Sequence, residues 1–317
     1  MSHLKKIIWG VEAFSEDKSL QNKTAHALKA ILSHTLAQVD PVYVLSPDQL
    51  RLPVEVFSDS VEAPHYNFDN FADHAREVAG VIEKELQDWL GGLNLPRMTT
   101  PRLLIQEEFS LRASVSSLIR FAKSEQADWI AVSTHARHGM ARFLLGSFAE
   151  TLVHASELPV LVVGPDSVEM SDVRFLIFPT DFTPASRRTF EKAVGLAQEL
   201  KVELILFHKV VYLTRYLSAF RQDAEDIDHQ MRNTGLRKEE AERWAEWGRE
   251  QGATVSVAIE DLVTADVASA ILARAHETPS SLVVMASQTG PVESAMLGSV
   301  TRKIVRHASC PVLVLHP

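Results

Sequence analysis

The chain has 317 residues, of which 46% are hydrophobic and 23% charged, and its formal net charge is −9. At about 150 residues per domain, this length predicts two domains, each large enough to bury its own core. No apolar run approaches the roughly 20 residues that a membrane-spanning helix needs. The negative charge argues against broad binding to nucleic acid or to anionic membranes, because both require a positive surface.

The N-terminus and the single cysteine bear on the cellular compartment. Residues 1–10 lack the long apolar core and the small-residue cleavage site of a secretory signal. Cys310 has no second cysteine with which to form an intramolecular disulfide, which agrees with a reducing compartment. We therefore expect a cytoplasmic protein in which Cys310 is a packed core thiol and not a nucleophile.

In the first half of the chain, short apolar strands alternate with helices. The helical segments show apolar residues at helical spacing, and Ser110 is a candidate N-cap. Residues 46–70 are rich in Pro, Asp and Ser and predict a long loop. Strands are predicted at 6–11, 42–45, 102–106, 129–133 and 160–163, and helices at 23–39, 78–89, after Ser110 and after Ser147.

The second half repeats this order. Thr183 and Pro184 form a cap followed by a proline at the first helical position. Residues 221–251 predict a long, mostly exposed helix with opposite charges at helical spacing. Strands are predicted at 175–178, 203–207, 254–259, 282–286 and 312–315, and helices after Thr183, at 221–251, at 265–276 and after Ser299. This alternation predicts an α/β fold with parallel sheets covered on both faces.

One short pattern occurs twice, at positions about half a chain length apart. Leu-Gly-Ser at 145–147 precedes a Pro-Val-Leu-Val segment at 159–162, and Leu-Gly-Ser at 297–299 precedes the same segment at 311–314, with the same spacing. The duplication predicts two tandem domains, at 1–165 and 172–317, joined by a polar linker at 164–172.

The repeated Gly-Ser pair also indicates where a ligand could bind. In an open parallel sheet, ligands bind beyond the carboxyl ends of the strands, and the N-terminus of a helix there suits a phosphate. Ser147 and Ser299 could donate hydroxyl groups to such a phosphate. As plain N-caps, the more common role for a serine at this place, they would only begin their helices.

Three sets of residues together resemble a known family. They are Phe-Pro-Thr-Asp-Phe-Thr-Pro-Ala-Ser at 178–186, Ser-Thr-His-Ala-Arg-His-Gly at 133–139, and the two Leu-Gly-Ser … Pro-Val-Leu-Val endings. With them, nearly the whole chain resembles the universal stress protein family in its tandem two-domain form. The resemblance implies two doubly wound, parallel five-stranded sheets of the adenine nucleotide alpha hydrolase-like kind. It also implies a non-enzymatic stress-response or regulatory role.

The resemblance further implies how the two halves associate. Single-domain members pair between chains, so we expect the halves to form an internal pseudo-dimer in which strands 160–163 and 312–315 meet antiparallel. Both strands are short and apolar, and an unpaired edge strand of that kind would be a liability. Further homodimerisation and an unknown protein partner remain open.

In nucleotide-binding members of the family, the phosphate loop reads Gly, two residues, Gly, nine residues, Gly, then Ser or Thr, and an Asp after the first strand contacts the adenosine. The two leading glycines let the backbone approach a polyphosphate closely. Both halves of this chain depart from that pattern. The matching residues are Glu12, Ser133, Ala136, Gly146 and Ser147 in the first half and Asp181, Met285, Gln288, Gly298 and Ser299 in the second.

Each half has therefore lost a different part of the implied nucleotide site. The first replaces the leading glycines by small residues and has Arg137 and Arg142 nearby, so that ATP binding remains open there. The second keeps the Asp as Asp181, but Met285 and Gln288 bring bulk to the place of the phosphates. ATP is the one cofactor that the resemblance suggests, and the first half has the better prospect of binding it.

Other arrangements of polar residues were weighed against these. His135 and His138 have a spacing that suits a metal, but no third ligand stands nearby, so no metal site is expected. Asp181 beside Thr180 and Thr183 could equally serve to cap a helix. The acidic pairs at 107–108 and 260–261 are more typical of solvated loops than of general acid–base catalysis.

No catalytic motif is present, and we expect no enzyme. One alternative is a slow ATP hydrolase or related nucleotide-processing enzyme, with Glu12 or Glu107 as its acidic group. Another is an apolar ligand in the second half, where Met285 and Gln288 would reshape the crevice.

Overall fold

The computed structural model describes residues 3–12, 18–46, 71–106, 108, 110–134, 147–210, 224–261, 266–287 and 298–316; at 71–77, 147 and 224–233 only the backbone is described. The chain divides into two compact units. The N-terminal unit is Leu4–Val163, and the C-terminal unit is Gly164–Pro317 together with Met1–His3.

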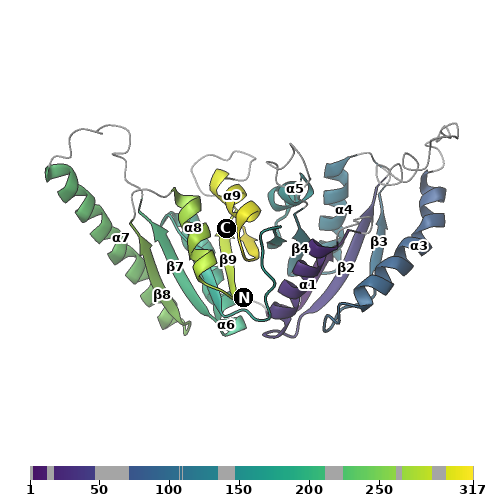
Figure 1. Ribbon diagram of the computed structural model, residues 1–317, viewed down its shortest axis with the longest axis horizontal. Helices are drawn as coiled ribbons and strands as arrows, with labels where there is room; N and C mark the ends of the chain where they lie inside the picture. The colour runs from purple at the N-terminus through teal and green to yellow at the C-terminus, as the bar shows by residue number, and fades with distance from the viewer. Residues whose placement is uncertain are drawn as a thin grey trace. The chain divides into compact units, whose positions relative to one another are not determined.

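The N-terminal unit contains five strands in the order β3-β2-β1-β4-β5, and neighbouring strands are parallel (Figure 1). α1 packs against β4 and β5, α3 against β3, and α4 against β2 and α5. The strands are β1 (Lys6–Gly10), β2 (Gln38–Leu45), β3 (Arg102–Ile105), β4 (Trp129–Ser133) and β5 (Val160–Val163), and the helices are α1 (Ser19–Leu32), α3 (Phe71–Gly91), α4 (Leu111–Ser124) and α5 (Ser147–Ala155).

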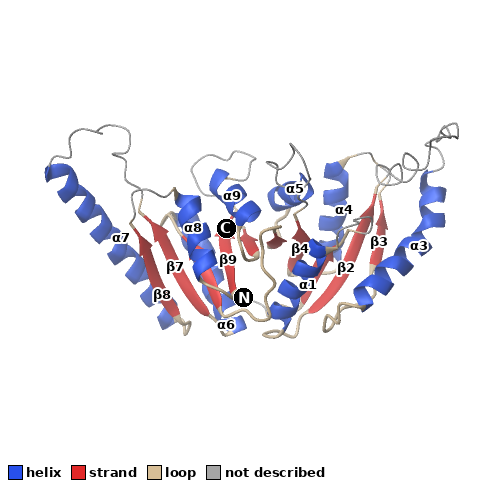
Figure 2. Cartoon of the chain, in the orientation of Figure 1, coloured by secondary structure: helices blue, strands red, loops and turns tan. Residues whose placement is uncertain are grey.

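The C-terminal unit repeats this arrangement in the order β10-β9-β6-β7-β8, again with parallel neighbours (Figure 2). The prediction of two tandem, doubly wound, parallel five-stranded sheets is thereby confirmed. The strands are β6 (Phe175–Pro179), β7 (Glu203–Lys209), β8 (Val255–Glu260), β9 (Ser281–Ala286) and β10 (Val312–Leu315), and the helices are α6 (Pro184–Leu200), α7 (Ala224–Glu250), α8 (Val267–Glu277) and α9 (Ser299–His307).

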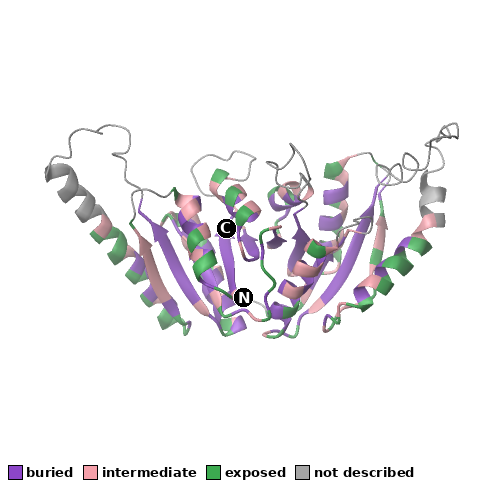
Figure 3. Cartoon of the chain, in the orientation of Figure 1, coloured by how far each residue is buried: buried purple, intermediate pink, exposed green. Residues whose placement is uncertain are grey.

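The central strands of both sheets are buried (Figure 3). Ile7, Ile8 and Trp9 of β1 are fully buried, as strands covered by helices on both faces must be. The helices instead bury one face each, and in α4 that face carries Val115 and Leu118, the residues that the helical spacing predicts. Within the part of the chain that the structure describes, no helix has the length and apolar character to cross a membrane.

Two predicted helix starts are confirmed by their hydrogen bonds. The Ser110 side chain accepts a hydrogen bond from the Ala113 amide at 3.4 Å and caps α4. The Thr183 hydroxyl accepts from the Ser186 amide at 3.2 Å and caps α6, which has Pro184 in its first turn. These side chains satisfy backbone amides that have no partner within the helix.

The predicted end of the first helix is wrong. The sequence predicts a helix to residue 39, but α1 ends at Leu32, and residues from Gln38 onward belong to β2. A distant residue explains the early end: the Arg97 guanidinium donates to the carbonyls of Leu32 (2.6 Å), Thr35 (2.8 Å) and Ala37 (3.0 Å). These contacts satisfy carbonyl groups that a longer helix would have bonded internally.

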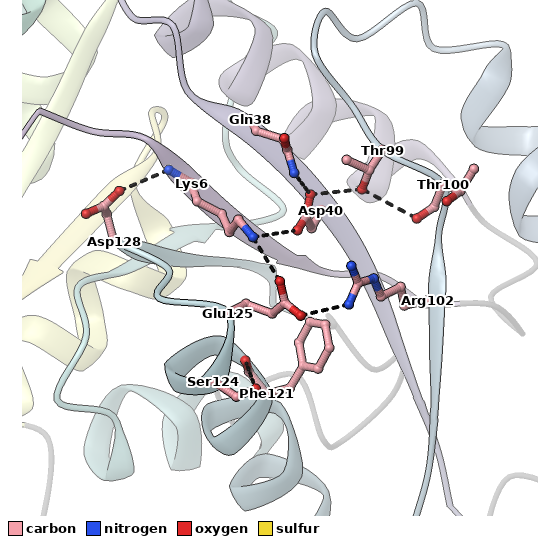
Figure 4. A network of polar contacts seen from close by, with 10 residues as sticks. All are labelled: Lys6, Gln38, Asp40, Thr99, Thr100, Arg102, Phe121, Ser124, Glu125 and Asp128. Atoms are coloured by element: carbon pink, nitrogen blue, oxygen red, sulfur yellow. Dashed lines mark hydrogen bonds and ion pairs between the residues drawn. The ribbon is translucent and has the colours of Figure 1, made fainter.

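Charged residues form a network at the amino ends of β1 and β2 (Figure 4). The fully buried Asp40 accepts hydrogen bonds from Gln38 Nε2 (2.6 Å) and Thr99 Oγ1 (2.9 Å), and its Oδ2 lies 3.5 Å from Lys6 Nζ. Lys6 also donates to Glu125 of α4 at 2.9 Å. The hydrogen bond with Glu125 raises the pKa of Lys6, and the same contact lowers the pKa of Glu125. This network joins two strands and a helix at the amino edge of the sheet.

Cys310 is buried, as expected for a core thiol. Burial raises the pKa of its thiol to about 11, although the nearby Ser281 side chain and Val283 backbone act to lower it. The thiol is therefore protonated at neutral pH, which makes it a poor nucleophile. The predicted loop at 46–70 lies, apart from residue 46, outside the described residues.

Candidate functional site

The strand order places one crevice in each unit. β1 lies between β2 and β4, and β6 lies between β7 and β9, so the strand order reverses beside β1 and β6. Ligands of open α/β sheets bind beyond the carboxyl ends of the strands at such a point. Among the sequence-predicted site residues, Glu12 and Ser133 stand at this edge of the N-terminal unit and Asp181 at that of the C-terminal unit.

Several predicted site residues lie outside the described residues. They include two of the positions that the family resemblance assigns to the phosphate loop of the N-terminal unit, together with the paired histidines and the arginines beside them. These residues are Glu107, His135, Ala136, Arg137, His138, Arg142, Gly146 and Gln288.

The end of β1 packs tightly against its neighbours. A Cβ atom at Gly10 would lie 3.0 Å from Val132 Cγ1 and 3.2 Å from Leu118 Cδ2. Such contacts are tighter than ordinary van der Waals contacts, so the Val132 and Leu118 side chains would have to shift by a few tenths of an ångström to admit a Cβ atom here. Glycine thus allows the strand to end against β4, two residues before Glu12.

Ser133, the last residue of β4, is buried, and its side chain is bonded inside the core. Its hydroxyl lies 2.9 Å from the Thr24 hydroxyl of α1, and Thr24 in turn donates to the Leu20 carbonyl at 3.1 Å. Because the Thr24 proton is used in that bond, the Ser133 hydroxyl donates to Thr24. The serine that replaces the first glycine of the implied loop is therefore accommodated between α1 and β4.

A lysine that the sequence reading did not single out lies beside the end of β1. Lys18 Nζ donates to the Glu12 carbonyl at 3.3 Å and lies 5.0 Å from the centre of the Trp89 ring. Burial lowers the pKa of Lys18, whereas Glu12 and Glu85 act to raise it. Lysine is a poor residue at the start of a helix, because the helix dipole repels it. Because the sequence pattern predicts this helix from residue 23 and not from Ser19, no local signal marked Lys18, which stands directly before α1.

Asp181 follows β6, and its carboxylate is part of the cap of α6. Oδ1 accepts hydrogen bonds from the Thr183 amide (3.0 Å), the Thr183 hydroxyl (2.8 Å) and the Ser186 hydroxyl (2.5 Å). Burial alone would raise the pKa of Asp181, but the hydrogen bonds from Ser186 and Thr183 outweigh it and hold the pKa below its ordinary value. The geometry thus supports the helix-capping interpretation of this residue.

Phe182, directly after Asp181, begins an aromatic cluster that the sequence reading missed. Its ring centre lies 4.7 Å from that of His208 at the end of β7 and 5.2 Å from that of Trp244 in α7, the latter edge to face. His208 Nδ1 lies 2.8 Å from the Thr180 carbonyl oxygen, to which it donates. Burial lowers the pKa of His208, and Arg237 and Lys209 add to this, while the bond to Thr180 opposes it. These side chains come from three elements, so no local pattern marks them.

The start of α9 does not have Ser299 as its N-cap. Ser299 is the first residue of the helix, and Gly298 occupies the N-cap position without a side-chain hydrogen bond. The N-cap interpretation of Ser299 is therefore wrong, and α5 likewise begins at Ser147. In the same unit Met285, the last residue but one of β9, is buried.

Within the described ranges, no three His, Cys, Asp or Glu side chains lie close enough together to hold a metal ion. Of the two acidic pairs weighed from the sequence, Glu108 and Asp261 are exposed, and Glu260 is the last residue of β8.

Sequence comparison places both units in one family. The model of the universal stress protein family matches residues 111–164 and 174–316. A universal stress protein of Mycolicibacterium smegmatis is 28% identical over 253 residues, which cover 77% of this chain and 78% of that protein. The universal stress protein YxiE of Bacillus subtilis is 29% identical over 145 residues, which cover 44% of this chain and 97% of YxiE.

Solved structures agree on the fold. A universal stress protein from Archaeoglobus fulgidus has a TM-score of 0.56 at 19% identity, over 99% of this chain and 97% of that one. A functionally unknown protein from Pseudomonas aeruginosa has a TM-score of 0.58 at 13% identity, over 99% and 93% of the two chains. With two parallel α/β units that the family model matches in succession, this chain belongs to the universal stress protein family, in its tandem form.

Proposed function

We propose that this protein is a non-catalytic stress-response regulator that binds one adenine nucleotide, ATP, in the crevice of its N-terminal unit. Family membership supports the stress-response role. The proposal assigns the phosphates to the start of α5, at Gly146 and Ser147, and the adenosine to the end of β1, at Glu12. The C-terminal unit keeps the fold but not the binding site.

The observation that carries this proposal is the contrast between the ends of β4 and β9. In the N-terminal unit the residue at this position is Ser133, whose hydroxyl is bonded to Thr24 within the core. In the C-terminal unit the matching residue is the larger Met285. A polyphosphate needs close approach to the backbone at this place, which a small residue permits better than a methionine.

Two further features favour the N-terminal crevice. Lys18 holds a positive charge beside the end of β1, where it would attract an anionic ligand. In the C-terminal unit the acidic residue of the implied adenosine contact, Asp181, already accepts three hydrogen bonds from the cap of α6.

Calorimetric titration with ATP, with and without magnesium, tests the proposal, and Ser147→Asp with Ser299→Asp forms a matched pair of variants. Each places a carboxylate in the first turn of a helix, where the dipole favours it, so both variants should fold. A carboxylate repels a phosphate, so Ser147→Asp should weaken ATP binding at least tenfold. Ser299→Asp should leave the affinity unchanged.

The opposite pattern, with Ser299→Asp as the damaging change, would contradict the assignment to the N-terminal unit. Phosphate release measured on the same samples separates a regulator from a slow ATP hydrolase. The proposal expects saturable binding without turnover. Steady release of phosphate that Glu12→Gln abolishes would establish the hydrolase instead.

A further inference from the structure

In the C-terminal unit, an aromatic residue directly follows the acidic residue of the implied adenosine contact. Phe182 follows Asp181, which itself follows β6 by one residue, and the matching residues after β1 are Glu12 and Ala13. At this sequence position the two units thus differ by a phenyl group.

The backbone holds Phe182 in an uncommon conformation. Its φ is +60°, in the left-handed region, and its amide donates to the Thr180 hydroxyl at 3.0 Å. A non-glycine residue in this region is strained and persists only where surrounding contacts stabilise it. Here those contacts are made by the ring.

Side chains from two elements, β7 and α7, enclose the Phe182 ring. His208 stands at the end of β7, Trp244 presents its indole from α7, and the Arg237 guanidinium lies 5.7 Å from the ring centre. The bond from His208 to the Thr180 carbonyl fixes the plane of the imidazole. The ring therefore occupies the space between the end of β6, the end of β7 and α7.

A flat heterocycle binds in such a space by stacking on aromatic side chains. We infer that the Phe182 side chain fills the space beside the His208 and Trp244 rings, which we call the aromatic slot, and thereby excludes the base of a nucleoside from the C-terminal unit. The ring is tilted by 47° to His208 and meets Trp244 edge to face at 88°, and it fills the space beside both aromatic side chains. This inference deepens the proposed function, because it explains why one of the two crevices is expected to bind.

Removal of the ring tests the inference. Phe182→Gly deletes the ring and relieves the backbone strain, Phe182→Ala deletes the ring alone, and Phe182→Leu keeps an apolar side chain of similar reach in the slot. Adenosine is the probe, because without phosphates it reports on the base slot and not on the phosphate loop. The five tryptophans of the chain, labelled with fluorine, give five NMR signals that single Trp→Phe variants assign.

Trp244 reports on the C-terminal slot, and Trp89, beside Lys18, reports on the N-terminal crevice. We expect adenosine to shift the Trp244 signal saturably in Phe182→Gly and Phe182→Ala, and to give no saturable shift in the wild type or in Phe182→Leu. An unchanged Trp244 signal in folded Phe182→Gly or Phe182→Ala would overturn the inference. So would a saturable Trp244 shift in the wild-type protein.

The Trp89 signal keeps this test separate from that of the proposed function. If ATP shifts Trp89 in no variant, the assignment of the nucleotide to the N-terminal unit fails. The response of Trp244 to adenosine still tests the inference in that case, because it depends on the aromatic slot of the C-terminal unit and not on ATP binding to the N-terminal unit.

Discussion

At the scale of single residues, the two units differ in what the acidic residue after the first strand does. Asp181 accepts three hydrogen bonds that begin α6, and Phe182 closes the space behind it. The sequence alone left open whether Asp181 contacts a ligand or caps a helix, because the same Asp-x-Thr pattern serves both. Only the distances within the turn favour the cap.

His208 should make the C-terminal unit sensitive to acid. Its pKa is lowered in the folded state, chiefly by burial, whereas the pKa of the unfolded side chain is about 6.5. As the pH falls below that value the unfolded state takes up the proton first, so the free energy of unfolding should decrease from pH 7 to pH 5. Urea titrations should show a smaller decrease in His208→Gln. The exposed His276→Gln serves as the control, and an equal effect of both changes would contradict this role.

Cys310 should resist modification. Because its thiol is buried and its pKa is about 11, the native protein at pH 8 should react with a disulfide reagent such as DTNB only as fast as it opens. Unfolding in guanidinium should release one reactive thiol per chain at once. Rapid reaction of the native protein would show that the thiol is accessible.

At the scale of elements, the alternation of strands and helices could be predicted, but the end of α1 could not. The run from Leu32 to Val39 is apolar enough to continue a helix, and the residue that ends it, Arg97, comes more than sixty positions later. The aromatic cluster of Phe182, His208 and Trp244 was missed for the same reason, because its members lie far apart in sequence. Local patterns identify elements, whereas these contacts depend on their packing.

Arg97 therefore carries a prediction for α1. Arg97→Met removes the donor to three carbonyl groups at the end of this helix, and we expect a loss of about 1–3 kcal/mol in the free energy of unfolding. Arg120→Met is the matched control, because Arg120 is exposed on α4, where it donates a hydrogen bond to the Ser117 hydroxyl at 3.2 Å. A similar, small effect of both changes in urea unfolding would contradict the role of Arg97.

Lys6 carries a second prediction at this scale. Lys6→Met leaves the buried Asp40 carboxylate without its cation and should cost about 2–3 kcal/mol. Asp40→Asn in the same chain removes the charge that was left unpaired, so the double variant should be more stable than Lys6→Met alone. A double variant that is less stable than both single variants would show that the ion pair with Asp40 is not what Lys6 contributes.

At the scale of the whole molecule, we propose that the two units correspond to domains 1–165 and 172–317 and that they pair through β5 and β10. Val162 and Val314 lie in these strands, and both are buried. Asp at both positions should expose apolar surface and cause aggregation, which light scattering would detect. A soluble double variant with an unchanged melting temperature would count against this pairing.

The duplicated Leu-Gly-Ser pattern predicted the tandem architecture, because a repeated element order follows from a repeated sequence. It could not predict the state of each site, because binding depends on what fills the crevice around it. Three residues distinguish the C-terminal unit from the N-terminal one. Met285 is buried, Asp181 accepts a hydrogen bond from Ser186, and Phe182 contacts Trp244. Shared architecture and unequal sites are thus compatible in one chain.

The number of nucleotides that one chain holds tests the central claim most directly. Native mass spectrometry of the wild-type protein with magnesium and ATP counts them without assigning a site. The account predicts a single ATP per chain in the wild type and in Ser299→Asp, and a much lower occupancy in Ser147→Asp at the ATP concentration that just saturates the wild type. Two bound nucleotides per chain, or none, would contradict it.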